Sequence, residues 1–131
     1  MAKISMTVSG REIVLRYNLQ VIVDVEEIYD TMDEAQKRMS GKGKARASTV
    51  VDVLTSMANA GEVHEGREAS FKREWFIENL TPAQFNQARV LIQQAIIVGN
   101  YRECAADDDR EVDSVLEEIR KKKEKASPAA D

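Results

Sequence analysis

The sequence predicts a small α+β domain that is mostly helical: an N-terminal β-hairpin packs on a bundle of about four helices, and a C-terminal amphipathic helix follows. Three observations lead to this fold class. Apolar and polar residues alternate over about residues 3–17, which is the period of a half-buried strand pair. From about residue 19 the apolar residues recur at spacings of three and four, which is the period of a helix. The 131 residues are enough for one such domain with its own core.

The hairpin prediction depends on strict alternation and on one turn. The apolar positions of the two strands are Ile4, Met6 and Val8, then Ile13, Leu15 and Tyr17. Between them, Ser9-Gly10 suits a tight turn, because glycine adopts positive φ without steric cost. Two strands alone are marginally stable, so their apolar face must pack on another element.

A helix, rather than a third strand, is expected from about residue 19 to residue 32. The run is rich in Val and Ile, which favours a strand, but Asp24, Glu26 and Glu27 interrupt any alternation. Asn18 is a favourable N-cap. The apolar positions fit one helical stripe, formed by Val21, Ile22, Val25, Ile28, Tyr29 and Met32. We expect this helix to cover the apolar face of the hairpin.

The middle of the chain predicts a charged connection followed by a second core helix. Residues 33–47 are charged and contain two glycines, so a short helical extension and a mobile loop are expected there. Ser48 or Thr49 is expected to cap the next helix, and Gly61 to end it, as glycine commonly does after a helix.

Two more helices complete the predicted core. A short helix is expected over residues 69–80, with Phe71 and Trp75, and as a third candidate Phe76, turned inward. The residues Thr81, Pro82 and Gln84 form a capping box, because the Thr is the N-cap and the Gln three positions later can reach back to it. This helix is expected to run to about Val98, with Gly99-Asn100 as its end.

A charged C-terminal segment, residues 104–131, is predicted to follow a core domain of residues 1–103. Its apolar residues form one narrow helical stripe, Val112, Val115, Leu116 and Ile119, which are the candidate partner-binding residues. A helix of about 15 residues is marginal alone and needs a surface for its stripe. That surface is either the chain's own domain or another protein, and the sequence leaves both open.

Composition and single residues give no support to catalysis, and no metal or cofactor is expected. The net charge is −4, and no apolar run reaches membrane-spanning length. His64, the only histidine, lies between acidic residues in a polar connector, so we interpret it as solvent-exposed. Cys104 is the only cysteine and has no turn signature of a nucleophile beside it. Asp107–Asp109 are contiguous, whereas a calcium loop alternates its ligands.

A basic arm is the strongest case for a binding function other than the C-terminal stripe. Its residues fall within ten positions: Lys37, Arg38, Lys42, Lys44 and Arg46. A flexible basic arm can contact phosphates, which makes a small nucleic-acid-associated regulatory protein the alternative function. No aromatic residue is interleaved, and charge runs are usually solvated, so we favour the interpretation as a solvated loop.

Two stretches together resemble a known family. The hairpin "SGREIVLRY" followed directly by "NLQVIVDVEEIY", with the acidic pair Glu26-Glu27, resembles the start of the tail assembly chaperones of long-tailed (siphovirus-type) bacteriophages and prophages. The variable basic linker and the helices that begin "STVVDVLTSMANAG" and "TPAQFNQARVLIQQAI" follow in the order typical of that family. The resemblance covers roughly residues 3–100 and lies in the order of elements rather than in one diagnostic motif.

The resemblance implies a non-catalytic role in the cytoplasm of a bacterial host. Such chaperones keep the long, coiled-coil-rich tape measure protein soluble before tail tube subunits polymerise around it. It therefore implies the tape measure protein as the main partner and the tail tube protein as a further one. It also implies self-association. Head-to-tail contacts need not close, so we expect open spirals rather than closed rings. No membrane partner is expected, because no apolar run reaches membrane-spanning length.

Overall fold

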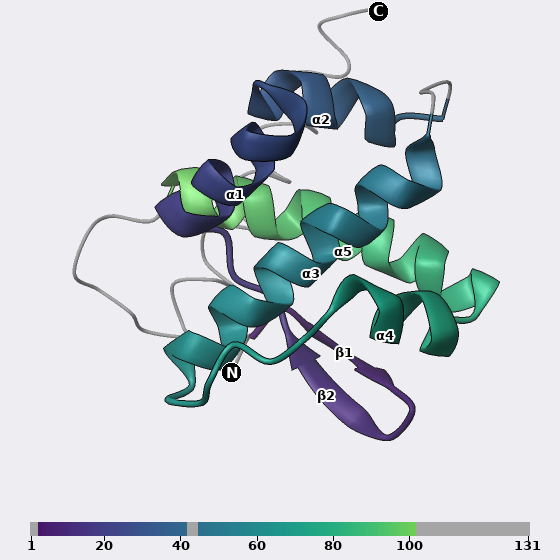
Figure 1. The fold of residues 1–131 in the computed structure, drawn as a ribbon. Helices are drawn as coiled ribbons and strands as arrows, with labels where there is room; N and C mark the ends of the chain where they lie inside the picture. Colours follow the sequence, from purple (N-terminus) through teal and green to yellow (C-terminus); the bar gives the residue numbers. More distant parts are fainter. Residues whose placement is uncertain (1–2, 42–44, 102–131) are drawn as a thin grey trace, which may run out of the picture.

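The computed structural model describes residues 3–41 and 45–101, and it confirms a mostly helical α+β fold with an N-terminal hairpin (Figure 1). In chain order the elements are β1 Ser5–Val8, β2 Arg11–Val14, α1 Leu19–Tyr29, α2 Met32–Met39, α3 Arg46–His64, α4 Arg73–Asn79 and α5 Pro82–Tyr101. α3 is central, because α1, α2, α4 and α5 all pack against it. The expected C-terminal helix lies outside the described residues.

The hairpin has the predicted turn, and β1 has the predicted alternation, whereas Ile13, Val14 and Leu15 are buried in succession and Tyr17 is only half-buried. β1 and β2 are antiparallel, with Ser5 opposite Val14 and Val8 opposite Arg11. Ser9 and Gly10 have φ values of 50° and 78°, as a two-residue turn of the type that matches strand twist requires. The apolar residues of the alternating pattern are buried: Ile4, Met6, Val8, Ile13 and Leu15.

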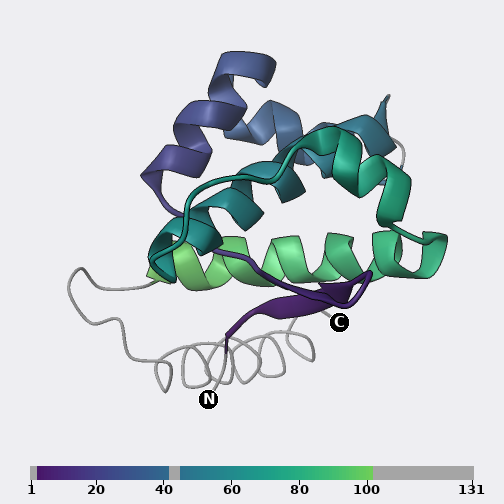
Figure 2. The same cartoon turned by 60° about the horizontal axis from the view of Figure 1, so that its bottom comes forward.

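The hairpin packs mainly on α3 and α5. The expectation that α1 covers its apolar face was therefore wrong. β2 contacts α3, and β1 contacts α5. The two views place the hairpin on one side of α3 and the α1–α2 pair on the other (Figures 1 and 2). The residues after β2 also contact α3: the backbone N–H of Arg16 donates to the carbonyl of Met57 at 3.2 Å.

The predicted helix over residues 19–32 is α1, which ends at Tyr29, and the helical extension expected after it is a separate helix, α2. Asn18 caps α1 as expected, since its side-chain oxygen accepts a hydrogen bond from the backbone N–H of Val21 at 3.2 Å. The C-cap of α1 is Asp30, which has a φ of 70°. Thr31 then caps α2 by accepting from the N–H of Glu34 at 3.0 Å. The expected short helical extension is therefore present, but as a separately capped helix rather than as a continuation of α1.

Both glycines that were expected to end helices lie inside them. α3 continues through Gly61 to His64, and α5 continues through Gly99 to Tyr101. A Cβ on Gly61 would lie 1.9 Å from the carbonyl oxygen of Val14, and one on Gly99 would lie 2.6 Å from that of Tyr17. These glycines let the helices lie directly against the backbone of the N-terminal segment.

The predicted start of α3 was wrong, whereas the predicted start of α5 is confirmed. α3 begins at Arg46, before Ser48 and Thr49, and Thr49 is completely buried instead of capping a helix. The capping box of α5 is as predicted: Thr81 and Gln84 exchange hydrogen bonds of 3.0 and 3.1 Å. Of the three aromatics beside α4, Phe71 and Phe76 are buried and Trp75 packs edge-on against Phe76.

Candidate functional site

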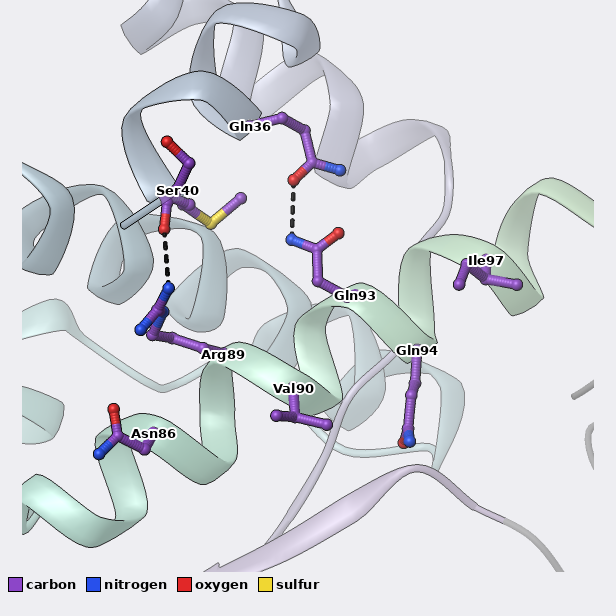
Figure 3. Close-up of a pocket in the computed structure, with 9 residues that line it drawn as sticks. Gln36, Ser40, Asn86, Arg89, Val90, Gln93, Gln94 and Ile97 are labelled. Atoms are coloured by element: carbon purple, nitrogen blue, oxygen red, sulfur yellow. Dashed lines mark hydrogen bonds between the residues drawn. The ribbon is translucent and has the colours of Figure 1, made fainter. Parts of the chain in front are cut away.

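A groove of about 750 Å³ lies between α2 and α5 (Figure 3). Residues from the end of α2 form one wall and residues from α5 form the other. The described lining consists of Gln36, Met39, Ser40, Asn86, Arg89, Val90, Gln93, Gln94 and Ile97.

The groove exists because α2 and α5 are each held by other elements. α2 packs on α1 and α3, while α5 packs on α3 and β1. Hydrogen bonds from long side chains connect the two helices: the amide of Gln93 donates to the side-chain oxygen of Gln36 at 2.8 Å. Arg89 donates to the backbone carbonyl of Met39 at 3.5 Å. Figure 3 shows Gln36 and Gln93 pointing toward one another from the two helices.

The described lining combines apolar surface with amides that donate and accept hydrogen bonds. Val90 is 58% exposed, so it offers apolar surface to the groove. Arg89 is the one charged side chain among the described lining residues, and no carboxylate occurs among them. Such a surface can bury the apolar stripe of a helix and satisfy the polar groups on its flanks, as helix-in-groove recognition requires.

The candidate basic arm is partly built into the fold. Lys37 and Arg38 belong to α2 rather than to a loop, and Arg38 pairs with Glu34 at 3.2 Å. Arg46 is the first residue of α3, and its guanidinium lies 5.9 Å from the ring centroid of Phe85. Lys42 and Lys44 lie outside the described residues. The described basic residues therefore do not form one unstructured arm.

Several other candidate residues are either exposed or lie outside the residues that the structure describes. His64 lies exposed in the last turn of α3, and Glu26 and Glu27 lie on the exposed face of α1. Cys104 and the stripe Val112, Val115, Leu116 and Ile119 lie outside the described residues, so their role remains a prediction. The division at residues 103 and 104 also remains a prediction.

Among the described residues, the buried charged side chain is that of Glu62, and it belongs to an internal ion pair. Glu62 is buried near the end of α3, and Arg67 binds its carboxylate through two guanidinium nitrogens at 2.9–3.2 Å. Arg11 of β2 approaches the same carboxylate at 3.5 Å. The hydrogen bonds from Arg67 are the main cause that lowers the pKa of Glu62 below its ordinary value. This cluster joins the hairpin, α3 and the following connector.

A second polar network joins α1, α3 and α4. Asp52 accepts hydrogen bonds from the hydroxyl of Tyr29 at 2.5 Å and from Arg73 at 2.8 Å. Arg73 also donates to the hydroxyl of Ser48 at 2.9 Å. Burial, and then the hydrogen bond to Asp52, raise the pKa of Tyr29 above its ordinary value. In the described part of the chain, every buried side-chain nitrogen and oxygen has a hydrogen-bond partner, so these networks are satisfied internally.

No group of three or more His, Cys, Asp or Glu side chains within residues 3–41 and 45–101 is placed to hold a metal ion. None of the helices in those two ranges has both the length and the apolar character needed to cross a membrane.

Sequence reasoning missed the groove, although α5 carries a signal for it. Asn86, Val90, Gln93 and Ile97 recur at spacings of four, three and four, which defines a second face of α5 beside its buried stripe. Val90 and Ile97, two apolar residues off the main stripe, were the indication that a second surface exists.

Comparison with known proteins gives no relative from which to assign the site: no protein family, curated protein or solved structure is significantly similar to this chain.

Proposed function

We propose that this chain is a non-catalytic tail assembly chaperone of a long-tailed bacteriophage or prophage, which binds the tape measure protein and keeps it soluble in the host cytoplasm. The order of elements in the sequence, which resembles that family, is one support. The observation that carries the proposal is the groove between α2 and α5, whose amide-rich and apolar lining suits one helix of an elongated, coiled-coil-rich client.

The groove fits a helix better than it fits a polyanion. Val90 and Ile97 offer apolar contacts, and burying the exposed part of Val90, which is 58% exposed, contributes about 1–2 kcal/mol. Arg38 and Arg46, two of the residues that a nucleic-acid-binding arm would need, already contact Glu34 and Phe85. The regulatory alternative therefore has less support than the chaperone.

Self-association is part of the proposal. A chaperone that coats a long client gains avidity from lateral contacts, because many weak contacts along one chain add. Head-to-tail contacts need not close, so we expect open spirals whose size grows with concentration. Sedimentation velocity tests this: a strictly monomeric profile at high concentration contradicts it.

The test of the main proposal is co-expression with the long tape measure protein encoded in the same genome. We expect the wild-type chain to move this client from the pellet into the soluble fraction. Val90→Asp, which places an unpaired carboxylate in the groove, should lose most of this effect. Ile77→Asp is the matched control, because Ile77 is 55% exposed on α4 and does not line the groove.

Three outcomes decide between the alternatives. Solubilisation by the wild type and by Ile77→Asp, but not by Val90→Asp, supports a chaperone that uses the groove. Wild-type protein that leaves the client in the pellet overturns the proposal. Protein that purifies with nucleic acid, seen as a raised ratio of absorbance at 260 to 280 nm, favours the regulatory alternative.

A further inference from the structure

The groove opens beside the point where the rest of the chain leaves the described domain. Ile97 lines the groove, and α5 ends one turn later at Tyr101, which is 59% exposed. Residues 102–131 follow directly. Any segment in this C-terminal part is therefore tethered next to the groove.

The tether is long enough to reach every part of the groove. Residues 102–111 separate Tyr101 from Val112, and ten extended residues span at most about 33–36 Å. The groove face of α5 runs from Asn86 to Ile97, which is roughly 17 Å of helix. The stripe that begins at Val112 can therefore lie alongside α5 without strain in the connection.

The charges of the segment and of the groove are complementary. Residues 103–118 contain eight acidic residues and one basic residue, Arg110. At helical spacing, Asp113 and Glu117 border one side of the apolar stripe, and Glu111 and Glu118 border the other. A helix with this pattern presents an apolar centre between two rows of carboxylates.

The groove offers the opposite arrangement. Val90 and Ile97 supply apolar surface beside the buried Met39, while Arg89 on α5 adds positive charge to it. Lys37 of α2 is exposed and follows the lining residue Gln36 in the sequence, but it does not itself line the groove. No carboxylate occurs among the described residues that line the groove, so none opposes an acidic helix.

We propose that the stripe Val112, Val115, Leu116 and Ile119 of the same molecule docks as a helix in the α2–α5 groove and occludes it until a client displaces it. This rests on the proposed function only in taking the groove as the site that receives a helix. The chain then carries its own competitor, and free chaperone exposes less apolar surface than chaperone with a client.

Tethering sets the strength of this competition. A short flexible linker gives an effective concentration of about 1 mM, so an added peptide that binds the open groove with a Kd of about 100 µM should bind the occluded groove roughly tenfold more weakly. A client with several helices overcomes a tenfold penalty through avidity, whereas a single short helix does not.

Disulfide trapping in the full chain tests the location. In a Cys104→Ser background, Val90→Cys is combined with Leu116→Cys, and oxidation is followed on a non-reducing gel. We expect an intramolecular disulfide, because docking brings the two Cα atoms within the approximately 7 Å that a disulfide needs. The control pair, Ile77→Cys with Leu116→Cys, has a comparably exposed cysteine on α4 and should react at least tenfold more slowly.

Each outcome of the trapping experiment bears on the proposal. Fast intramolecular oxidation at Val90 alone supports it. Equal rates at Val90 and Ile77 overturn it, because they indicate random encounters of the tether. Disulfide-linked dimers as the main product also overturn it, since the segment then docks on a second copy.

Peptide binding tests the competition separately. The probe is a fluorescein-labelled peptide with the sequence of residues 107–123, and its anisotropy is measured with the full chain. Replacing all four stripe residues of the chain by Ser should open the groove and tighten peptide binding about tenfold. Adding Val90→Asp to that variant should abolish the binding.

The competition experiment separates this inference from the proposed function. Equal, tight binding of the peptide to wild type and to the four-Ser variant overturns self-occlusion but leaves the groove as a helix site. No binding to either variant also overturns it, and co-expression with the tape measure protein then still decides the proposed function independently.

Discussion

Replacing Gly61 by Ala is the sharpest test of how α3 meets the hairpin. The added Cβ would lie 1.9 Å from the carbonyl oxygen of Val14 and 2.7 Å from its carbonyl carbon. Both atoms are backbone, so a side-chain rotation cannot relieve the contact and α3 or β2 must move. Overpacking of this kind costs about 1–3 kcal/mol, and the movement strains the hydrogen bond from Arg16 to Met57 as well.

The sign of the effect makes the prediction discriminating. In an exposed helix, Gly→Ala stabilises by about 0.8–1.0 kcal/mol, because alanine is the better helix former. We expect the opposite here: a net loss of about 1–2 kcal/mol, which lowers the thermal midpoint by roughly 5–15 °C in a domain of this size.

Thermal and urea unfolding followed by circular dichroism measure this change. Gly41→Ala is the control, because a Cβ at Gly41 meets no atom within 4 Å. Its stability should stay within about 0.5 kcal/mol of the wild type, as surface substitutions usually do. A midpoint of Gly61→Ala at or above the wild-type value would refute the packing of α3 on the backbone of Val14.

Three further predictions concern the core, an ion pair and a helix cap. Leu15→Ala should cost about 2–5 kcal/mol in urea unfolding, because Leu15 is buried and its removal leaves a cavity. Arg67 lowers the pKa of Glu62 in the folded chain, so the unfolded chain binds more protons in acid. The stability from this pair is therefore present above the pKa of an unfolded glutamate, about 4.3, and is lost as the pH falls through the lower pKa of the folded state. Glu62→Gln should therefore flatten the pH dependence of the unfolding free energy between about pH 5 and pH 3, and an unchanged slope contradicts this assignment. Thr81→Ala should lower stability by about 0.5–2 kcal/mol through loss of the cap on Gln84, whereas Thr81→Ser should not.

Local signals in the sequence predicted local structure well. The Ser9-Gly10 turn, the Asn18 cap and the Thr81–Gln84 capping box each depend on neighbours within four residues, and each occurs as expected. The break between α1 and α2 also had a local signal, because Thr31 and Glu34 have the spacing of a capping box. We overlooked it because the apolar stripe continued to Met32.

Signals that depend on tertiary contacts were misinterpreted. A glycine after a helical run usually marks its end, and nothing in the adjacent residues distinguishes that role from close backbone approach. Gly61 and Gly99 are inside helices because Val14 and Tyr17, far away in the chain, lie against them. The wrong prediction that α1 covers the hairpin has the same cause. Whether the hairpin packs on α1 or on α3 and α5 depends on how the three helices pack together, which the adjacent residues do not reveal.

The overall charge of the chain conceals the feature on which the groove proposal depends. Residues 35–51 contain five basic residues and no acidic one, whereas residues 103–118 contain eight acidic residues and one basic one. The net charge of −4 averages these two segments, so it lowers the expectation of any charged partner. The described start of the basic segment belongs to α2, which forms one wall of the groove. The description ends at Tyr101 of α5, which forms the other wall, and the acidic segment follows Tyr101 in the sequence. Opposite charges in two segments of one chain attract each other, and this attraction supports the proposal that the C-terminal segment occupies the groove.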